Sequence, residues 1–141
     1  MASRMTLLQH LAAVLATRYR IVHADTGLVV ASDSYALSLR PASGKGELWD
    51  TPWPVNGTDI IRVKFRDVDK GLFVFVRFPE KMITLQPKVA SSWLINNLGE
   101  GRVSIRLQSE PLFWTPRDGK VGLAKRSMAT TSQEWQLITV Q

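Results

Sequence analysis

Basic residues in predicted loops are the side chains of this sequence best suited to act on a partner. Lys125, Arg126 and Ser127 follow a predicted strand, Arg117 stands at a predicted hairpin turn, and Lys45 lies within "ASGKGEL". An exposed cation can enter an acidic pocket or pair with an anion. The net charge of +6 agrees with such partners, although ordinary solvated surface charge explains the same residues.

The sequence offers little for catalysis or metal binding. It contains no cysteine, which excludes disulfides, thiolate metal sites and a cysteine nucleophile. Its two histidines, His10 and His23, do not have the spacing of a zinc site. The run Gly44-Lys45-Gly46 is too short for a phosphate-binding loop and no helical pattern follows it. We therefore expect a protein that is not an enzyme and that has no cofactor and no metal.

The first 18 residues have two explanations. Val14-Leu15-Ala16 resembles a signal-peptidase site, and cleavage there would leave Thr17 at the start of the mature chain. Leu7, Leu11 and Leu15 also fall at helical spacing, which favours a short amphipathic helix docked on the domain. No apolar run approaches the roughly 18 residues of a membrane-spanning helix. We expect a cytoplasmic rather than a secreted protein, without a membrane or nucleic-acid partner, and the oligomeric state stays open.

Two markers recur with one period in the remaining chain, 19–141. Trp53, Trp93 and Trp135 are separated by 40 and 42 residues, and each of the first two precedes an Arg-Val pair by nine residues. Arg20, Arg62 and Arg102 are separated by 42 and 40 residues. A period of about 41 residues indicates internal repetition. We place the repeats at about 19–60, 61–101 and 102–141.

Each repeat contains four short segments typical of strands, separated by turn residues. The segments are rich in β-branched and aromatic residues and mostly alternate in polarity. A unit of this size cannot bury its own apolar face, whereas three units can close a barrel and leave few free edges. The sequence therefore predicts an all-β domain, a β-trefoil, with Trp53, Trp93 and Trp135 as equivalent core residues. Asn56-Gly57-Thr58 fits a glycosylation acceptor, although a turn between repeats explains it equally.

The Gln-x-Trp pattern at Gln133-Glu134-Trp135 resembles that of the ricin-type trefoil lectins. It is degraded to Ser91-Ser92-Trp93 and Thr51-Pro52-Trp53 in the other repeats. The resemblance implies a sugar site with an aspartate just after the second strand of a repeat. Only Asp33 stands near such a place. Trp114, Lys120 and Asp33 are the candidate glycan contacts, and Trp114 is equally expected to pack in the core.

Residues 82–141 resemble the small fungal β-trefoil serine-protease inhibitors. The similarity rests on "SSWLINNLGEGRVSIRL", "PLFWT", "DGKVGLAKR" and "SQEWQLITV" in that order. In that family an exposed loop inhibits, and a Lys or Arg enters the acidic pocket of trypsin-like targets.

We therefore expect first a serine-protease inhibitor, with Arg126 as the leading contact. The second expectation is a lectin of the ricin-type trefoil kind, with anionic glycans among its ligands. Arg126-Ser127 would be the bond presented to the protease, and Lys125, Arg117 and Lys45 are the other candidates. The same late basic cluster of Arg117, Lys120, Lys125 and Arg126 could bind an anionic glycan instead. The loop Ala31-Ser32-Asp33-Ser34 has no basic residue, so a trypsin-directed site is not expected there.

Overall fold

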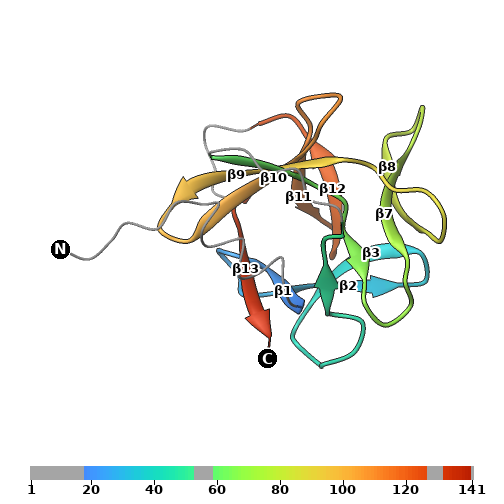
Figure 1. Cartoon of the computed structure of the whole chain (residues 1–141). Helices are drawn as coiled ribbons and strands as arrows, with labels where there is room; N and C mark the ends of the chain where they lie inside the picture. Colours follow the sequence, from blue (N-terminus) through green and yellow to red (C-terminus); the bar gives the residue numbers. More distant parts are fainter. Residues whose placement is uncertain (1–17, 53–58, 127–131, 141) are drawn as a thin grey trace.

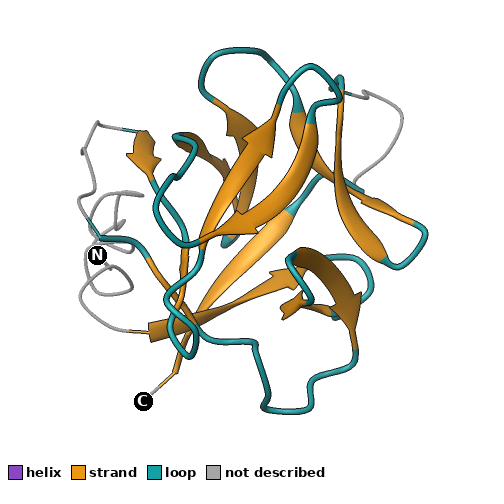
Figure 2. Ribbon diagram, turned by 90° about the vertical axis from the view of Figure 1, so that its right-hand side faces the viewer, coloured by secondary structure: helices purple, strands orange, loops and turns teal. Residues whose placement is uncertain are grey.

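The computed structural model describes residues 18–52, 59–126 and 132–140. Strands and the loops between them make up these residues, and no helix occurs among them (Figure 2). Within the described ranges there is accordingly no helix long and apolar enough to cross a membrane. The predicted N-terminal helix and the Asn56 acceptor lie outside the described residues.

Thirteen strands follow one another along these ranges (Figure 1). They are β1 (Arg18–His23), β2 (Val29–Asp33), β3 (Ala36–Arg40), β4 (Trp49–Asp50), β5 (Ile60–Val63), β6 (Arg66–Asp67), β7 (Phe73–Arg77), β8 (Met82–Gln86), β9 (Trp93–Gly99), β10 (Arg102–Leu107), β11 (Phe113–Arg117), β12 (Lys120–Ala124) and β13 (Trp135–Val140).

Seven of these thirteen strands form a closed ring. β1 pairs with β4, β4 with β6, β5 with β9, β9 with β10, β10 with β13, and β13 returns to β1, all antiparallel. β5 and β6 are successive parts of one run of chain, so the ring has no gap in it. Closure leaves few backbone groups at free edges.

Three hairpins cap one end of this barrel. They are β2–β3, β7–β8 and β11–β12, one from each repeat. The hairpins also bond to one another, because Leu39 N donates to Gly119 O at 2.8 Å and Leu85 N donates to Tyr35 O at 3.0 Å. A closed barrel capped by three hairpins is the β-trefoil that the repeats predict.

The register shows which residues are equivalent, and it corrects two of the sequence markers. Trp49 pairs with Tyr19, Trp93 with Val63 and Trp135 with Val103. Trp49, not Trp53, therefore takes the tryptophan position of the first repeat, and Trp53 lies outside the described residues. The same register places Arg18, not Arg20, in line with Arg62 and Arg102. Both errors arose because Trp53 happens to stand nine residues before Arg62 and Arg20 happens to stand 42 residues before it, which matches the spacing of the true markers.

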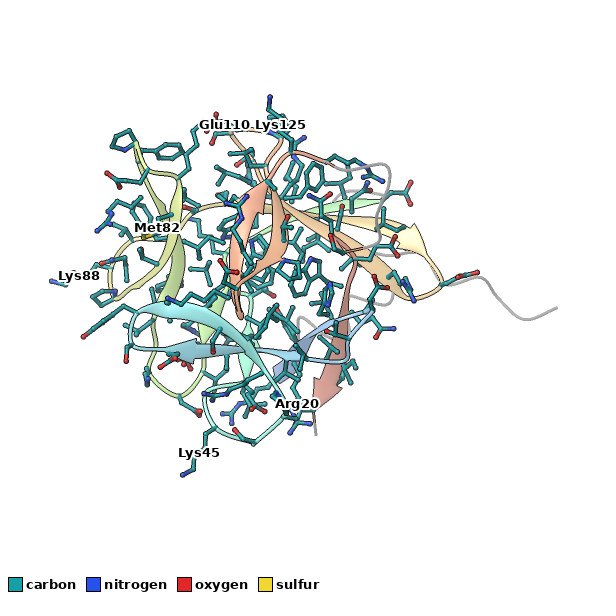
Figure 3. All side chains as sticks on the ribbon, turned by 180° about the vertical axis from the view of Figure 1, so that it is seen from behind. Arg20, Lys45, Met82, Lys88, Glu110 and Lys125 are labelled. Carbon is teal, nitrogen blue, oxygen red and sulfur yellow. The ribbon has the colours of Figure 1, made fainter. Side chains whose placement is uncertain are left out.

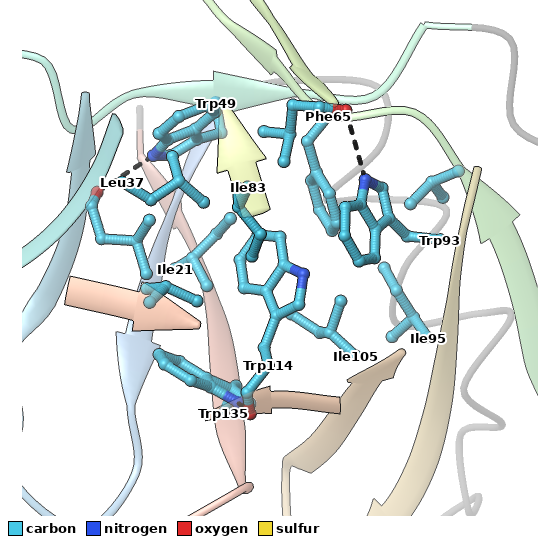
Figure 4. Packing of buried hydrophobic residues seen from close by; sticks show 14 of the residues in the cluster. Ile21, Leu37, Trp49, Phe65, Ile83, Trp93, Ile95, Ile105, Trp114 and Trp135 are labelled. Carbon is cyan, nitrogen blue, oxygen red and sulfur yellow. Dashed lines mark hydrogen bonds between the residues drawn. The ribbon is translucent and has the colours of Figure 1, made fainter. Parts of the chain in front are cut away.

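Each of the three tryptophans donates its indole N–H to a backbone carbonyl of its own repeat. Trp49 Nε1 reaches Val30 O at 3.0 Å, Trp93 Nε1 reaches Val74 O at 3.4 Å, and Trp135 Nε1 reaches Trp114 O at 3.1 Å (Figure 4). Because the indole is buried, this bond satisfies its only polar group. The bond fixes each hairpin to the barrel beneath it.

Trp114 fills the centre of the core. It occupies the position held by the smaller Val30 and Val74 in the other repeats, and its ring centre lies 5.5 Å from that of Trp93 and 6.0 Å from that of Trp135. The side chain is fully buried (Figure 4). Of the two roles expected for Trp114, the structure thus shows core packing, and the buried side chain is not exposed to a glycan.

Candidate functional site

The outward faces of the three hairpins differ, although their backbones are equivalent. Inward residues such as Val74, Val76 and Leu85 join the core, so the alternating residues between them face outward. On β7–β8 these outward residues form three cross-strand pairs, which we call the second-hairpin face: Phe73–Gln86, Phe75–Thr84 and Arg77–Met82.

Only the second-hairpin face keeps accessible aromatic rings. Phe73 and Phe75 are half-buried. The first-hairpin counterpart of Phe75 is Ala31, which is fully buried, and the third-hairpin counterpart of Phe73 is Phe113, which is 8% exposed. The connection from β8 to β9 has six residues (87–92), against eight (41–48) from β3 to β4 and ten (125–134) from β12 to β13.

Segments of the two longer connections cover the other faces. On the first hairpin the outward Arg40 donates from Nη2 to Lys45 O of the connection, and on the third the Arg126 guanidinium lies 5.8 Å from the centre of the Phe113 ring. The connection after β8 is the shortest of the three, and Phe73 and Phe75 on the second-hairpin face stay partly exposed.

Polar groups border the rings of the second-hairpin face. Gln86 Nε2 donates to Thr84 Oγ1 at 3.3 Å, and the Arg77 guanidinium contacts Met82 Sδ at 3.8 Å and Glu80 at 3.1 Å. Aromatic rings offer flat apolar contact, while the amide, hydroxyl and guanidinium groups offer directional hydrogen bonds. This combination suits a neutral polar ligand with apolar faces.

Tyr35 stands beside this face, at the tip of the β2–β3 hairpin. Its carbonyl accepts the hydrogen bond from Leu85 N, so its backbone lies next to β8, and its side chain is 67% exposed. Its φ is 70°, and that of Ser34 is 46°, as in a type I′ turn. Glycine normally takes the second turn position, as Gly119 does in the third repeat. A tyrosine there holds an exposed ring at the expense of backbone strain, which is typical of functional positions.

Neither Tyr35 nor the phenylalanines were among the sequence candidates. "GLFVFV" was predicted as a strand, but its apolar residues fall on both faces of that strand. A strand with one face on the core needs apolar residues only on that face, so the second apolar row was the available signal. The position of Tyr35 depends on turn geometry, which an aromatic residue does not signal.

Lys45 lies on a loop that the scaffold holds firmly. The buried Glu47 carboxylate accepts hydrogen bonds from Ser43 N at 2.7 Å, Ser43 Oγ at 2.9 Å and Gly44 N at 3.0 Å. Arg40 Nη2 donates to Lys45 O, and Ser32 N donates to Gly46 O at 2.8 Å. The Lys45 side chain itself projects into solvent (Figure 3). The loop thus presents one cation on a fixed backbone.

The charge of Glu47 is stabilised where it lies. Burial by itself would raise the pKa of this carboxyl. The hydrogen bonds from Ser43 and Gly44 and the nearby Arg40 outweigh burial and lower the pKa below its ordinary value of 4.5. Glu47 is also the first-repeat counterpart of Gln133 in the Gln-x-Trp pattern, because both stand two residues before the equivalent tryptophans. The pattern in the first repeat is therefore Glu47-Leu48-Trp49, not Thr51-Pro52-Trp53.

The remaining predicted contacts gather on the third hairpin. Arg117 pairs with Lys120 across the turn of β11–β12, and its side chain lies over Gly122. Lys125 and Arg126 follow β12, both exposed, and Lys125 O accepts a hydrogen bond from Gln133 Nε2 at 2.8 Å. Ser127 lies outside the described residues.

Asp33 ends β2 and is exposed, opposite Ala36. The register aligns Asp33 with Arg77 and Arg117 at the last position of the second strand of each repeat. The first repeat therefore has a carboxylate at this position, and the other two repeats have an arginine. Among the described residues no group of three His, Asp or Glu side chains could hold a metal ion.

Comparisons with solved structures agree on the fold. A designed threefold-symmetric protein, ThreeFoil, superposes with a TM-score of 0.74 at 15% identity, covering 87% of this chain and 99% of its own. A ricin B-like lectin from Macrolepiota procera, solved in complex with lactose, gives a TM-score of 0.71 at 15% identity, covering 88% and 96%.

An endo-β-galactosidase from Clostridium perfringens that releases GlcNAcα1-4Gal gives a TM-score of 0.75 at 13% identity. The match covers 88% of this chain but only 32% of that enzyme. At these identities the similarity shows the fold alone. No family model matches the chain, and no curated protein matches its sequence.

The Glu47 hydrogen bonds predict a pH-dependent contribution to stability. Because the folded state lowers the pKa of Glu47, this contribution is present above pH 4.5 and is lost as the pH falls through the lower folded value. Glu47→Gln should reduce the free energy of unfolding by about 1–3 kcal/mol at neutral pH. Urea unfolding at pH 7 and pH 3 should show a gap between wild type and variant that narrows in acid. A gap of equal size at both pH values would contradict this account.

The turn strain at Tyr35 predicts that glycine stabilises the protein. Tyr35→Gly should raise the free energy of unfolding by about 1 kcal/mol relative to Tyr35→Ala, because both remove the ring but only glycine relieves the positive φ. Thermal unfolding of the two variants measures this difference. Equal stabilities would show that the turn is not strained.

Proposed function

We propose that this protein is a carbohydrate-binding β-trefoil that is not an enzyme and that binds sugar at the second-hairpin face. The observation that carries the proposal is the pair of accessible rings, Phe73 and Phe75, bordered by Thr84, Gln86 and Arg77. The apolar C–H faces of a sugar ring pack on aromatic rings, and its hydroxyls pair with amide, hydroxyl and guanidinium groups. The lactose complex of the similarly folded lectin supports a glycan as the first ligand to test.

Tyr35 would complete this site from the neighbouring repeat. The bond from Leu85 N fixes its backbone to β8, so the ligand need not order the backbone that carries the ring. An aromatic side chain on a backbone that is already ordered loses less conformational entropy on binding than one on a flexible loop. Asp33, at the other end of the same turn, is a nearby hydroxyl acceptor, and it is the one predicted glycan contact that this placement retains.

Phe75→Ala should weaken glycan binding by about tenfold, because stacking on one aromatic ring contributes roughly 0.5–1.5 kcal/mol in addition to the area it buries. A glycan array identifies the ligand, and calorimetry on the strongest hit then measures the affinity of each variant. Phe78→Ala is the matched control, since Phe78 is an exposed ring of the same hairpin outside this face.

The possible outcomes distinguish the proposed function from the proposed position of the binding site. Loss of affinity in Phe78→Ala with none in Phe75→Ala would move the site to the hairpin tip. A blank array across neutral and charged glycans would overturn the function itself. Melting temperatures of both variants check that each is folded.

The Lys45 loop favours serine-protease inhibition as a second candidate function. A substrate-like inhibitor needs a basic residue on a loop already held in its bound shape, because little ordering entropy is then lost. The Glu47, Arg40 and Ser32 hydrogen bonds provide such support around Lys45. Arg126, the leading candidate from sequence, instead lies over the Phe113 ring. We therefore propose Lys45–Gly46 as the bond presented to a trypsin-like protease.

Lys45→Ala should abolish inhibition of trypsin, while Lys45→Arg should preserve it, because both basic side chains fit an acidic pocket. Lys88→Ala is the matched control, since Lys88 is an exposed lysine on the corresponding connection of the second repeat (Figure 3). A residual-activity assay measures each inhibition constant. No inhibition by the wild type at micromolar concentration would remove this candidate, and loss only in Arg126→Ala would return the contact to Arg126.

A further inference from the structure

A row of basic residues crosses the outer surface of the barrel on β5, β9 and β10, and it ends beside the third hairpin, where Arg106 pairs with Phe113 of β11. Leu94 on β9 pairs with Arg62 of β5 on one side and with Arg106 of β10 on the other. Directly opposed residues point to the same face of a sheet, and the intervening Ile61, Ile95 and Ile105 belong to the core. Arg62, Leu94 and Arg106 therefore face outward together, and Lys64 continues the outward series on the chain that carries Arg62. We call these four residues the barrel-face cluster.

The pseudo-threefold symmetry shows what this cluster lacks. At the equivalent place in the first repeat, Asp50 pairs with Arg66 across the strands, and their side chains form a bidentate ion pair at 2.8 and 3.0 Å. Asp50 follows Trp49 as Leu94 follows Trp93, so leucine replaces the carboxylate at the second site. Arg106, the counterpart of Arg66, has therefore lost its internal counter-ion.

The neighbouring cation is also without an internal partner. Arg102, the counterpart of Arg62 in the third repeat, pairs with Glu134 at 3.0 Å and with Asp25 at 3.3 Å. Within the described ranges, no ion pair involves Arg62, Lys64 or Arg106. Arg106 Nε is enclosed with no hydrogen-bond partner there, while its Nη2 donates to Gln108 O at 3.4 Å. No outward position of β5, β9 or β10 holds Asp or Glu.

Strand geometry sets the spacing of the charges. Neighbouring strands lie about 4.8 Å apart, so Arg62 and Arg106, two strands apart, have backbones separated by roughly 10 Å. The paired strands hold this separation without help from a ligand. Such a row suits an anionic polymer that crosses the strands and meets successive cations.

We propose that the barrel-face cluster binds a sulfated polysaccharide, at a site separate from the second-hairpin face. Sulfate groups would pair with Arg62, Arg106 and Lys64, and the sugar between them would lie over Leu94. Asn96, the next outward residue of β9, offers an amide to sugar hydroxyls. None of the four residues is aromatic, and the neighbouring Phe113 ring, opposite Arg106, is only 8% exposed and lies beneath Arg126. Bases therefore have little aromatic surface on which to stack, which favours a polysaccharide over single-stranded nucleic acid.

Dextran sulfate is the probe, with unsulfated dextran as its neutral counterpart. The double variant Arg62→Gln/Arg106→Gln should weaken dextran sulfate binding by about tenfold or more, and it should lower the slope of log affinity against log salt by about two. The matched control is Arg117→Gln/Lys120→Gln, which removes the same charge from the third hairpin. Its affinity should stay within about threefold of the wild type after allowing for the general loss of charge.

Leu94→Asp provides a second variant that keeps every cation. It restores the carboxylate found at Asp50, so it should neutralise Arg106 and weaken dextran sulfate binding while leaving the protein folded. Melting temperatures check folding, and binding of the neutral glycan at the second-hairpin face should be unchanged. The neutral-glycan measurement thus distinguishes an error in the barrel-face inference from an error in the proposed function, on which the barrel-face inference does not depend.

Three results would overturn the inference. One is dextran sulfate affinity that survives both the double variant and Leu94→Asp. Another is a larger loss in Arg117→Gln/Lys120→Gln, which would place the anion on the late basic cluster. The third is equal or tighter binding of a single-stranded oligonucleotide of similar charge, which would make the ligand nucleic acid.

Discussion

Three buried indole N–H groups hold the hairpins to the barrel, and the rest of the molecule depends on them. Each tryptophan pairs with the first strand of its own repeat and with the first strand of the following one, as Trp93 does with Val63 and Leu107. The same side chain donates to a carbonyl on the second strand of its own repeat. One residue thus connects the two layers of the fold and two successive repeats, and burial requires that its polar group be satisfied.

The threefold scaffold also makes each candidate site a departure from symmetry. Two short apolar side chains and one large one, Val30, Val74 and Trp114, occupy the same core position, so only one repeat fills the centre. On the surface, the rings of the second hairpin stay partly exposed, and a leucine replaces the carboxylate beside Arg106. A backbone that repeats three times can present different side chains in each repeat, because the residues outside the core are free to differ.

Sequence reasoning found the fold because its main signals are local and repeated. Trp93 and Trp135 had the right period, and turn residues separated the strands. The first repeat was assigned wrongly for two reasons. Trp53 stands nine residues before Arg62, just as Trp93 stands nine residues before Arg102. The strand at Trp49–Asp50 has only two residues, so its sequence shows no alternation of polarity. The candidate sites were less accessible: Lys45 was identified, but the support from Glu47 depends on a hydrogen-bond network, and the exposure of Phe75 depends on what the other loops cover.

The central claim is that sugar binds at the second-hairpin face, and chemical-shift mapping tests it most directly. Backbone amides of the isotopically labelled protein would be followed by NMR during titration with the best glycan from an array. The account predicts that the largest changes fall on Phe75, Thr84 and the Tyr35 turn. Changes centred instead on the equivalent positions of the first or third hairpin, Ser38 or Thr115, would contradict it.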